Sequence, residues 1–90
     1  MIERIREDTL NLMKIPGLSG HEDLVRNYIK EELKKIDLKP IFDKFGNTVV
    51  TFPGKSPRVM LFTHMDQLGL IVRRITNDVF LKFERVGGVP

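Results

Sequence analysis

The chain has 90 residues, of which 41% are hydrophobic and 30% charged, so it fits one small folded domain and is too apolar for a disordered tail. Its 15 lysines and arginines are interspersed with 12 aspartates and glutamates, and this diffuse net charge of +3 argues against a nucleic-acid or membrane surface. The absence of cysteine excludes disulfides, thiolate metal sites and a cysteine nucleophile.

The N-terminal part of the chain predicts two helices. Apolar residues are compatible with a helix from Ile2 to Met13, and the segment "IPGLSGHE" then breaks the pattern. Ser19 and Glu22 have the spacing of a capping box, which predicts that a second helix begins near Gly20. The second helix carries an apolar stripe at steps of three and four residues, made of Leu24, Val25, Tyr28, Ile29, Leu33 and Ile36.

After Asp37 the pattern predicts about five short strands. They are the β-branched and aromatic runs LKPIFD, NTVVTF, RVMLFTH, LGLIVRRI and VFLKFERV, separated by turn signals. The Gly46-Asn47 pair predicts a hairpin or tight connection, and the apolar run RVMLF predicts a central strand covered on both faces. The expected fold class is therefore α/β, with two N-terminal helices before about five strands. Two helices are too few to cover both faces of such a sheet.

His64 and Asp66 directly follow the predicted central strand. Residues two apart in extended backbone point to the same side, and ligand sites in open α/β sheets form where strands end. The imidazole could bind a metal through one nitrogen while the carboxylate fixes its orientation and tautomer. The same spacing also describes a strand-end histidine beside a turn-forming aspartate, and a catalytic zinc site needs three protein ligands. His21, the other histidine, is expected to be an exposed loop residue.

No signal-peptide pattern is present at the N-terminus, and no apolar run reaches the length of about 18 residues that a membrane span requires. We therefore expect a cytoplasmic protein.

Taken in order, the motifs resemble the N-terminal part of the M42 metallo-aminopeptidases, and the resemblance covers essentially all 90 residues. It rests on P-x-x-S-G in "IPGLSG", D-x-x-G-N in "DKFGN", "HMDQLG" after an apolar strand, and a strand pair that ends in "GG". Members of this family often have glutamate where this chain has Gln67, but that neighbour is not a principal ligand.

This resemblance implies a metal-dependent aminopeptidase that removes N-terminal residues from peptides. Two divalent metal ions, zinc or cobalt, would activate the attacking water. His64 matches the family's first metal-binding histidine, and Asp66 matches the catalytic aspartate that tunes the metal site. Residues 1–90 would be the N-terminal portion of a zinc-peptidase-type α/β/α catalytic domain, ending near the start of the inserted dimerisation domain.

The family's bridging aspartate, its glutamate pair and its later ligands have no counterpart in these 90 residues. We therefore expect the isolated chain to supply one corner of the site, to be inactive alone and to bind metal weakly or not at all. The expected partners are a peptide substrate and either the rest of the peptidase or further copies of the chain. A non-catalytic remnant that binds a partner and an unrelated small α/β binding module stay open as alternatives.

Overall fold

The computed structural model describes all 90 residues and contains two helices and four short strands. The elements are, in chain order, α1 (Ile2–Met13), α2 (Asp23–Lys35), β1 (Ile41–Phe42), β2 (Thr48–Val49), β3 (Gly69–Ile75) and β4 (Leu81–Val86). The strands form two separate antiparallel pairs, β1 with β2 and β3 with β4. The predicted order of two helices followed by short strands in a small α/β protein is confirmed.

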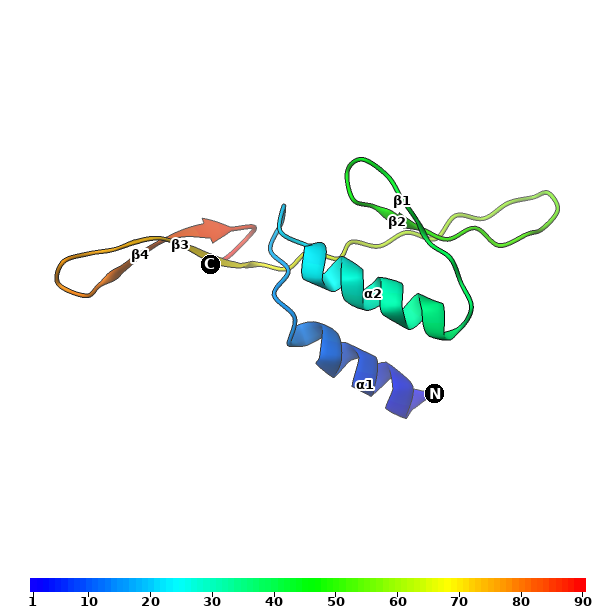
Figure 1. The fold of residues 1–90 in the computed structure, drawn as a ribbon, viewed down its shortest axis with the longest axis horizontal. Coiled ribbons are helices and arrows are strands. Elements are labelled where there is room, and N and C mark those ends of the chain that lie inside the picture. Colours follow the sequence, from blue (N-terminus) through cyan, green and yellow to red (C-terminus); the bar gives the residue numbers. More distant parts are fainter.

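The molecule is open and elongated. The radius of gyration of its Cα atoms is 17.3 Å, and its principal extents are 62 × 32 × 23 Å, whereas a compact domain of this length has a radius of gyration of roughly 12 Å. The β3–β4 hairpin lies at one end, the yellow-green segment before β3 reaches the other end, and the helices lie between them (Figure 1). The elements therefore share little common core.

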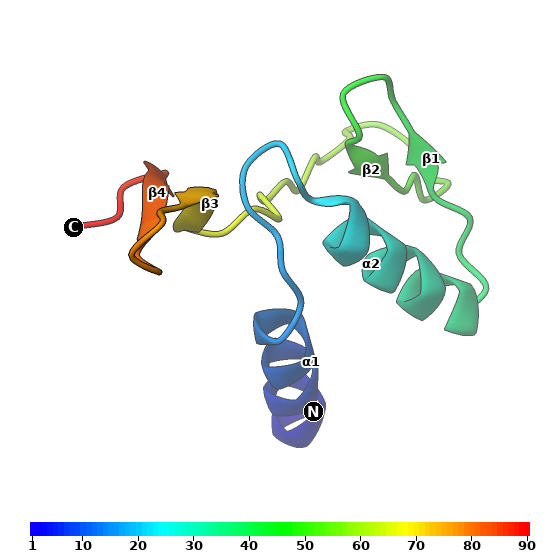
Figure 2. The ribbon, with the colours of Figure 1, turned by 60° about the vertical axis from the view of Figure 1, so that its left-hand side comes forward.

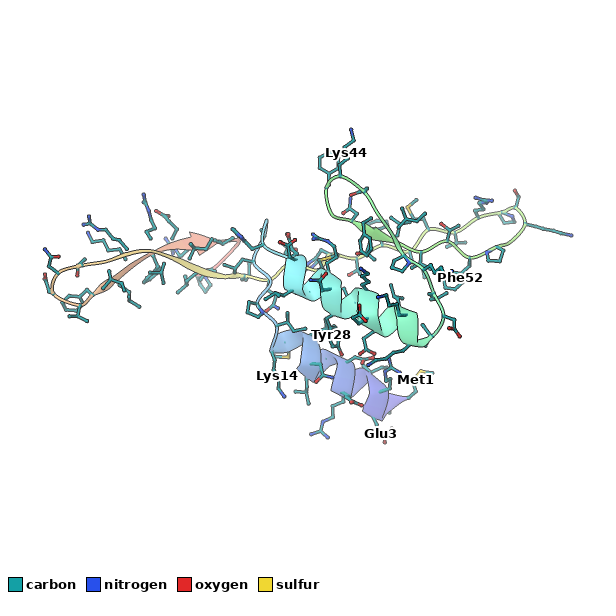
Figure 3. All side chains as sticks on the ribbon, in the orientation of Figure 1. Met1, Glu3, Lys14, Tyr28, Lys44 and Phe52 are labelled. Atoms are coloured by element: carbon teal, nitrogen blue, oxygen red, sulfur yellow. The ribbon has the colours of Figure 1, made fainter.

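The two helices contact each other through a few side chains. The amide of Asn11 donates a hydrogen bond of 3.3 Å to the hydroxyl of Tyr28, and Figure 3 shows Tyr28 on the side of α2 that faces α1. Arg4 reaches Glu32 at 3.5 Å. Val25, in the first turns of α2, is 3% exposed and is the one buried hydrophobic residue. Neither helix is long and apolar enough to cross a membrane.

A tight loop joins β1 to β2, as the Gly46-Asn47 pair predicts. Gly46 has a φ of +84°, which glycine adopts without the steric penalty of a Cβ atom. Its carbonyl accepts a hydrogen bond of 2.6 Å from Nε of Arg26, and a Cβ at this position would overlap the guanidinium. This contact attaches the loop to α2.

The β3–β4 hairpin turns through the three residues Asn77, Asp78 and Val79. The backbone N–H of Val79 donates to the carbonyl of Thr76, and the N–H of Thr76 donates to the carbonyl of Phe80. The register shifts between Val72 and Arg74. The two C-terminal strands form within the predicted runs LGLIVRRI and VFLKFERV, but β4 begins only at Leu81, because Val79 belongs to the turn.

The predicted central strand RVMLFTH is not a strand in this structure. Residues 58–63 have no ladder partner, and the side chains of Val59, Met60, Leu61 and Phe62 are 82% to 92% exposed. Apolarity on both faces predicts a buried strand only where neighbouring strands supply hydrogen bonds and other layers cover the faces. The four strands pair among themselves in two hairpins, so none supplies ladder hydrogen bonds to this segment.

Candidate functional site

The loop between α1 and α2 supplies one half of the candidate site. The backbone N–H of His21 donates to the carbonyl of Leu18 at 2.8 Å, and Gly20 has a φ of +82°. A turn with positive φ at its third residue is of the type that requires glycine there. Ser19, the second residue of this turn, is placed at its exposed edge.

Ser19 does not cap α2, so this part of the sequence prediction is wrong. The helix begins at Asp23, with Glu22 at the N-cap position and no side-chain capping hydrogen bond. The Glu22 carboxylate instead accepts a hydrogen bond of 2.7 Å from the N–H of Gly20. The later start of α2 leaves the hydroxyl of Ser19 free for a partner elsewhere.

That partner is Asp66. The hydroxyl of Ser19 donates a hydrogen bond of 2.5 Å to Oδ2 of Asp66, and the other carboxylate oxygen, Oδ1, lies 2.9 Å from Nδ1 of His64. His64 and Asp66 therefore converge, as their spacing in extended backbone predicts. Ser19 joins them from a distant part of the chain.

The geometry assigns the tautomer of His64. Its Nδ1 faces two acceptors, Oδ1 of Asp66 at 2.9 Å and the backbone carbonyl of Asp66 at 3.2 Å. In a neutral imidazole one nitrogen donates and the other accepts, so Nδ1 carries the hydrogen and Nε2 carries the lone pair. The side chain of His64 is 83% exposed, which leaves Nε2 accessible to a ligand.

Hydrogen bonds also set the charge state of Asp66. The hydroxyl of Ser19 is the largest cause that lowers the pKa of this carboxyl below its ordinary value, and the hydrogen bond to His64 lowers it further. Burial opposes these effects only in part, since the side chain of Asp66 is 37% exposed. The carboxylate therefore stays ionised to a lower pH than an ordinary aspartate, and its charge attracts the imidazole hydrogen.

Gln67 fastens the two halves of the site together. Its backbone N–H donates to the carbonyl of Gly17 at 2.7 Å, and its side-chain amide donates to the carbonyl of Ile15 at 2.9 Å. Leu18 forms an isolated parallel bridge with Gln67 and packs over Gly69, where a Cβ would overlap the leucine. In Figure 2 the loop between the helices rises to meet the yellow segment that leads into β3.

The sequence alone does not predict these roles of Ser19 and Gln67. The spacing of Ser19 and Glu22 predicts a helix cap, and the resemblance marks Gln67 only as a departure from glutamate. The one sequence signal for the role of Gln67 is that its side chain is an amide. A carboxylate at this position could not donate a hydrogen bond to the carbonyl of Ile15. His21 is exposed, as predicted, and its ring takes no part in the hydrogen bonds of the site.

His64, as oriented by Asp66, fits the role of a single metal ligand. A neutral imidazole with a free Nε2, oriented by a carboxylate on Nδ1, is the usual arrangement of a metal-binding histidine. The structure contains no group of three or more histidine, cysteine, aspartate or glutamate side chains arranged to hold a metal ion. Glu84, the glutamate that follows the motif, is bound to Arg73 on the surface of the hairpin at 2.6 Å.

Comparison with known proteins gives a consistent picture. The family model for M42 glutamyl aminopeptidases matches residues 46–90. The chain is 38% identical over 79 residues to the lysyl aminopeptidase of Pyrococcus furiosus, a match that covers 87% of the chain and 23% of that protein. It is 35% identical over 80 residues to the glutamyl aminopeptidase of Lactococcus lactis subsp. cremoris, covering 86% of the chain and 22% of that protein.

A third relative is a putative aminopeptidase of Acetivibrio thermocellus, 38% identical over 87 residues, with 92% of the chain and 26% of that protein covered. The chain thus spans about a quarter of the length of the curated relatives it matches. No solved structure matches the chain significantly.

Proposed function

The chain belongs to the M42 glutamyl aminopeptidase family, and from this premise we propose that it forms the N-terminal portion of a metal-dependent aminopeptidase. In this proposal residues 1–90 are part of the catalytic domain, end near an inserted dimerisation domain and act on peptides in the cytoplasm. His64 is a metal ligand, and Asp66 tunes the metal site from the opposite side of the imidazole.

One observation carries the proposal. The region matched by the family includes His64 and Asp66, and in that region the imidazole is held with Nδ1 on a carboxylate and Nε2 exposed. The carboxylate fixes the ring so that its lone pair points to an accessible side, and this orientation suits coordination of a divalent cation.

The metal ions would be two zinc or cobalt ions in the complete site. Bound divalent ions supply Lewis acidity toward a peptide carbonyl and lower the pKa of water. Within this chain, Nε2 of His64 would bind the metal, and Asp66 would hold the imidazole hydrogen and increase the basicity of the ligand. The other ligands would come from polypeptide outside residues 1–90, since the relatives are about four times as long as their match to this chain.

A hybrid enzyme tests this function. Residues 1–90 would replace the matching segment of the Pyrococcus furiosus lysyl aminopeptidase, and hydrolysis of lysyl-p-nitroanilide would be measured with cobalt or zinc. We expect the hybrid to be active and the isolated chain to be inactive, because one imidazole cannot hold two metal ions. In the hybrid, His64→Ala should reduce kcat/KM by at least about 100-fold, and Asp66→Asn should weaken metal binding about 10- to 100-fold.

His21→Ala is the matched control, because it removes the other histidine of the chain, an exposed residue whose ring takes no part in the hydrogen bonds of the site. A hybrid that keeps full activity with His64→Ala would contradict the assignment of His64. Hydrolysis by the isolated 90-residue chain would contradict the view that the site is incomplete here.

A partner-binding role without catalysis is the second candidate, and the exposed apolar segment at residues 59–62 favours it. The hybrid separates the two candidates. A well-folded hybrid that binds no metal and hydrolyses no substrate would support the non-catalytic role.

A further inference from the structure

We propose that Ser19 is a positioning residue for His64. Acting through Asp66, its hydroxyl fixes the imidazole with hydrogen on Nδ1 and the lone pair on Nε2. The value of this arrangement for metal binding rests on the proposed function of His64. The positioning itself is a property of residues 1–90 and can be measured without metal or substrate.

An aspartate side chain is free to rotate unless both of its carboxylate oxygens are held. A carboxylate that is held at one oxygen can still rotate about its terminal bond and offer the other oxygen in many directions. In this site Asp66 is held at both oxygens, at Oδ2 by Ser19 and at Oδ1 by His64. Removal of the serine hydroxyl would release one side of the carboxylate and loosen its hold on Nδ1.

No other side chain can take over this task. The side chains that form hydrogen bonds with the Asp66 carboxylate are those of Ser19 and His64. Gln67 is directed to the carbonyl of Ile15, and the hydroxyl of Thr63 lies 3.5 Å from the backbone carbonyl of His64. Control of the carboxylate therefore depends on a residue 47 positions away in sequence.

Ser19 is itself well placed for this role. It lies in a turn closed by the Leu18 carbonyl and the N–H of His21, with Gly20 supplying the positive φ. The preceding residues of the loop are joined to the segment of Asp66 by both hydrogen bonds of Gln67. The hydroxyl is thus carried on a backbone that is fixed relative to its target.

Nitrogen NMR of the two histidines tests the proposal on the 90-residue chain. Long-range proton–nitrogen spectra report which ring nitrogen carries the hydrogen, and they would be recorded at about pH 8.5, where imidazoles are neutral. His21 has no such hydrogen bonds and is an internal reference in the same sample. We expect His64 to carry hydrogen mainly on Nδ1, in contrast to His21.

Ser19→Ala should shift the tautomer ratio of His64 toward that of His21 by about two- to tenfold, the effect of one hydrogen bond. Ser19→Thr keeps the hydroxyl and should restore most of the ratio. Ser56→Ala, at the other serine of the chain, should change nothing.

Two results would overturn the proposal. One is a spectrum of the wild-type chain in which His64 and His21 have the same tautomer ratio. This test requires no variant. The other is an unchanged His64 ratio in Ser19→Ala. Neither result bears on whether the hybrid aminopeptidase is active, so failure of this inference and failure of the proposed function can be told apart.

Discussion

At the scale of single residues, Asp43 organises the loop between β1 and β2. One of its carboxylate oxygens accepts the backbone N–H groups of Phe45 and Asn47, both at 2.9 Å, and the other accepts the side-chain amide of Asn47 at 2.7 Å. The side-chain amide of Asn47 is the largest cause that lowers the pKa of Asp43, and the backbone N–H groups of Asn47, Phe45 and Gly46 add to it. The D-x-x-G-N pattern of the sequence is thus a hydrogen-bonded loop.

This geometry gives the loop a defined pH dependence. Because the pKa of Asp43 is lower in the folded loop than in the unfolded chain, its contribution to stability is fully present above the unfolded value of about 3.9. The contribution is lost as the pH falls through the lower, folded value. In an NMR titration, the amide resonances of Phe45 and Asn47 should report a midpoint below 3.9.

Asp43→Asn should abolish the titration seen at the amides of Phe45 and Asn47 and increase the hydrogen exchange of both. The substitution replaces one carboxylate oxygen with an NH2 group, which would face the donating side-chain amide of Asn47 without an acceptor between them. Asp78→Asn, in the other hairpin, is the control and should leave both amides unchanged. A midpoint at or above the ordinary value in the wild-type chain would show that these hydrogen bonds do not form.

At the scale of elements, the sequence predicts the regions with strong local signals. Helices α1 and α2 follow the spacing of their apolar residues, and the β3–β4 hairpin follows two runs separated by a turn signal. The start of α2 was predicted three residues too early because the Ser19 and Glu22 pattern is local, whereas the actual partner of Ser19 is distant in sequence. The segment RVMLFTH failed as a strand for the same reason, since its strand partners cannot be read from local pattern.

The β3–β4 turn contains one residue in an unfavourable conformation. A three-residue hairpin loop usually places glycine at its left-handed position, and here Val79 occupies that position with a φ of +67°. A β-branched side chain with positive φ costs about 1 to 2 kcal/mol, and glycine removes this cost at an entropic cost of about 0.5 to 1 kcal/mol.

Val79→Gly should therefore stabilise the hairpin by about 0.5 to 1 kcal/mol, measured as slower hydrogen exchange of the cross-strand amides in β3 and β4. Asp78→Gly, at the neighbouring position without positive φ, should instead destabilise the hairpin. If both glycine variants weakened the hairpin equally, the left-handed conformation of Val79 would be wrong.

At the scale of the whole molecule, the chain exposes more surface than a compact protein of its size. Its accessible area is 8450 Å², compared with about 5,400 Å² for a compact protein of 10.4 kDa. The excess of about 3,000 Å² on one chain is more than the roughly 1,000 to 2,500 Å² that each partner buries in an obligate interface. Exposed apolar side chains of the segment 59–62 and of both strands of the C-terminal hairpin contribute to it.

We therefore expect the isolated chain to self-associate, with a sedimentation coefficient that rises with protein concentration. Phe62→Lys should weaken this association about tenfold or more, because it places a charge in the exposed apolar segment. Phe45→Lys is a matched control, since Phe45 is 87% and Phe62 90% exposed but Phe45 lies in the β1–β2 loop. A chain that stays monomeric at all concentrations, or two variants with equal effects, would contradict this expectation.

The contacts that orient His64 join residues 47 to 52 positions apart in the chain. Closing a flexible loop of that length costs roughly 3.5 kcal/mol in chain entropy, which increases only slowly with further length. A few hydrogen bonds, each worth about 0.5 to 1.5 kcal/mol, and the packing of Leu18 over Gly69 must offset this cost. Closure of the loop brings the Ser19 hydroxyl to Asp66. Because the contact between His64 and Asp66 spans only two residues, it can form locally, and loop closure adds the second hold on the carboxylate that fixes the imidazole.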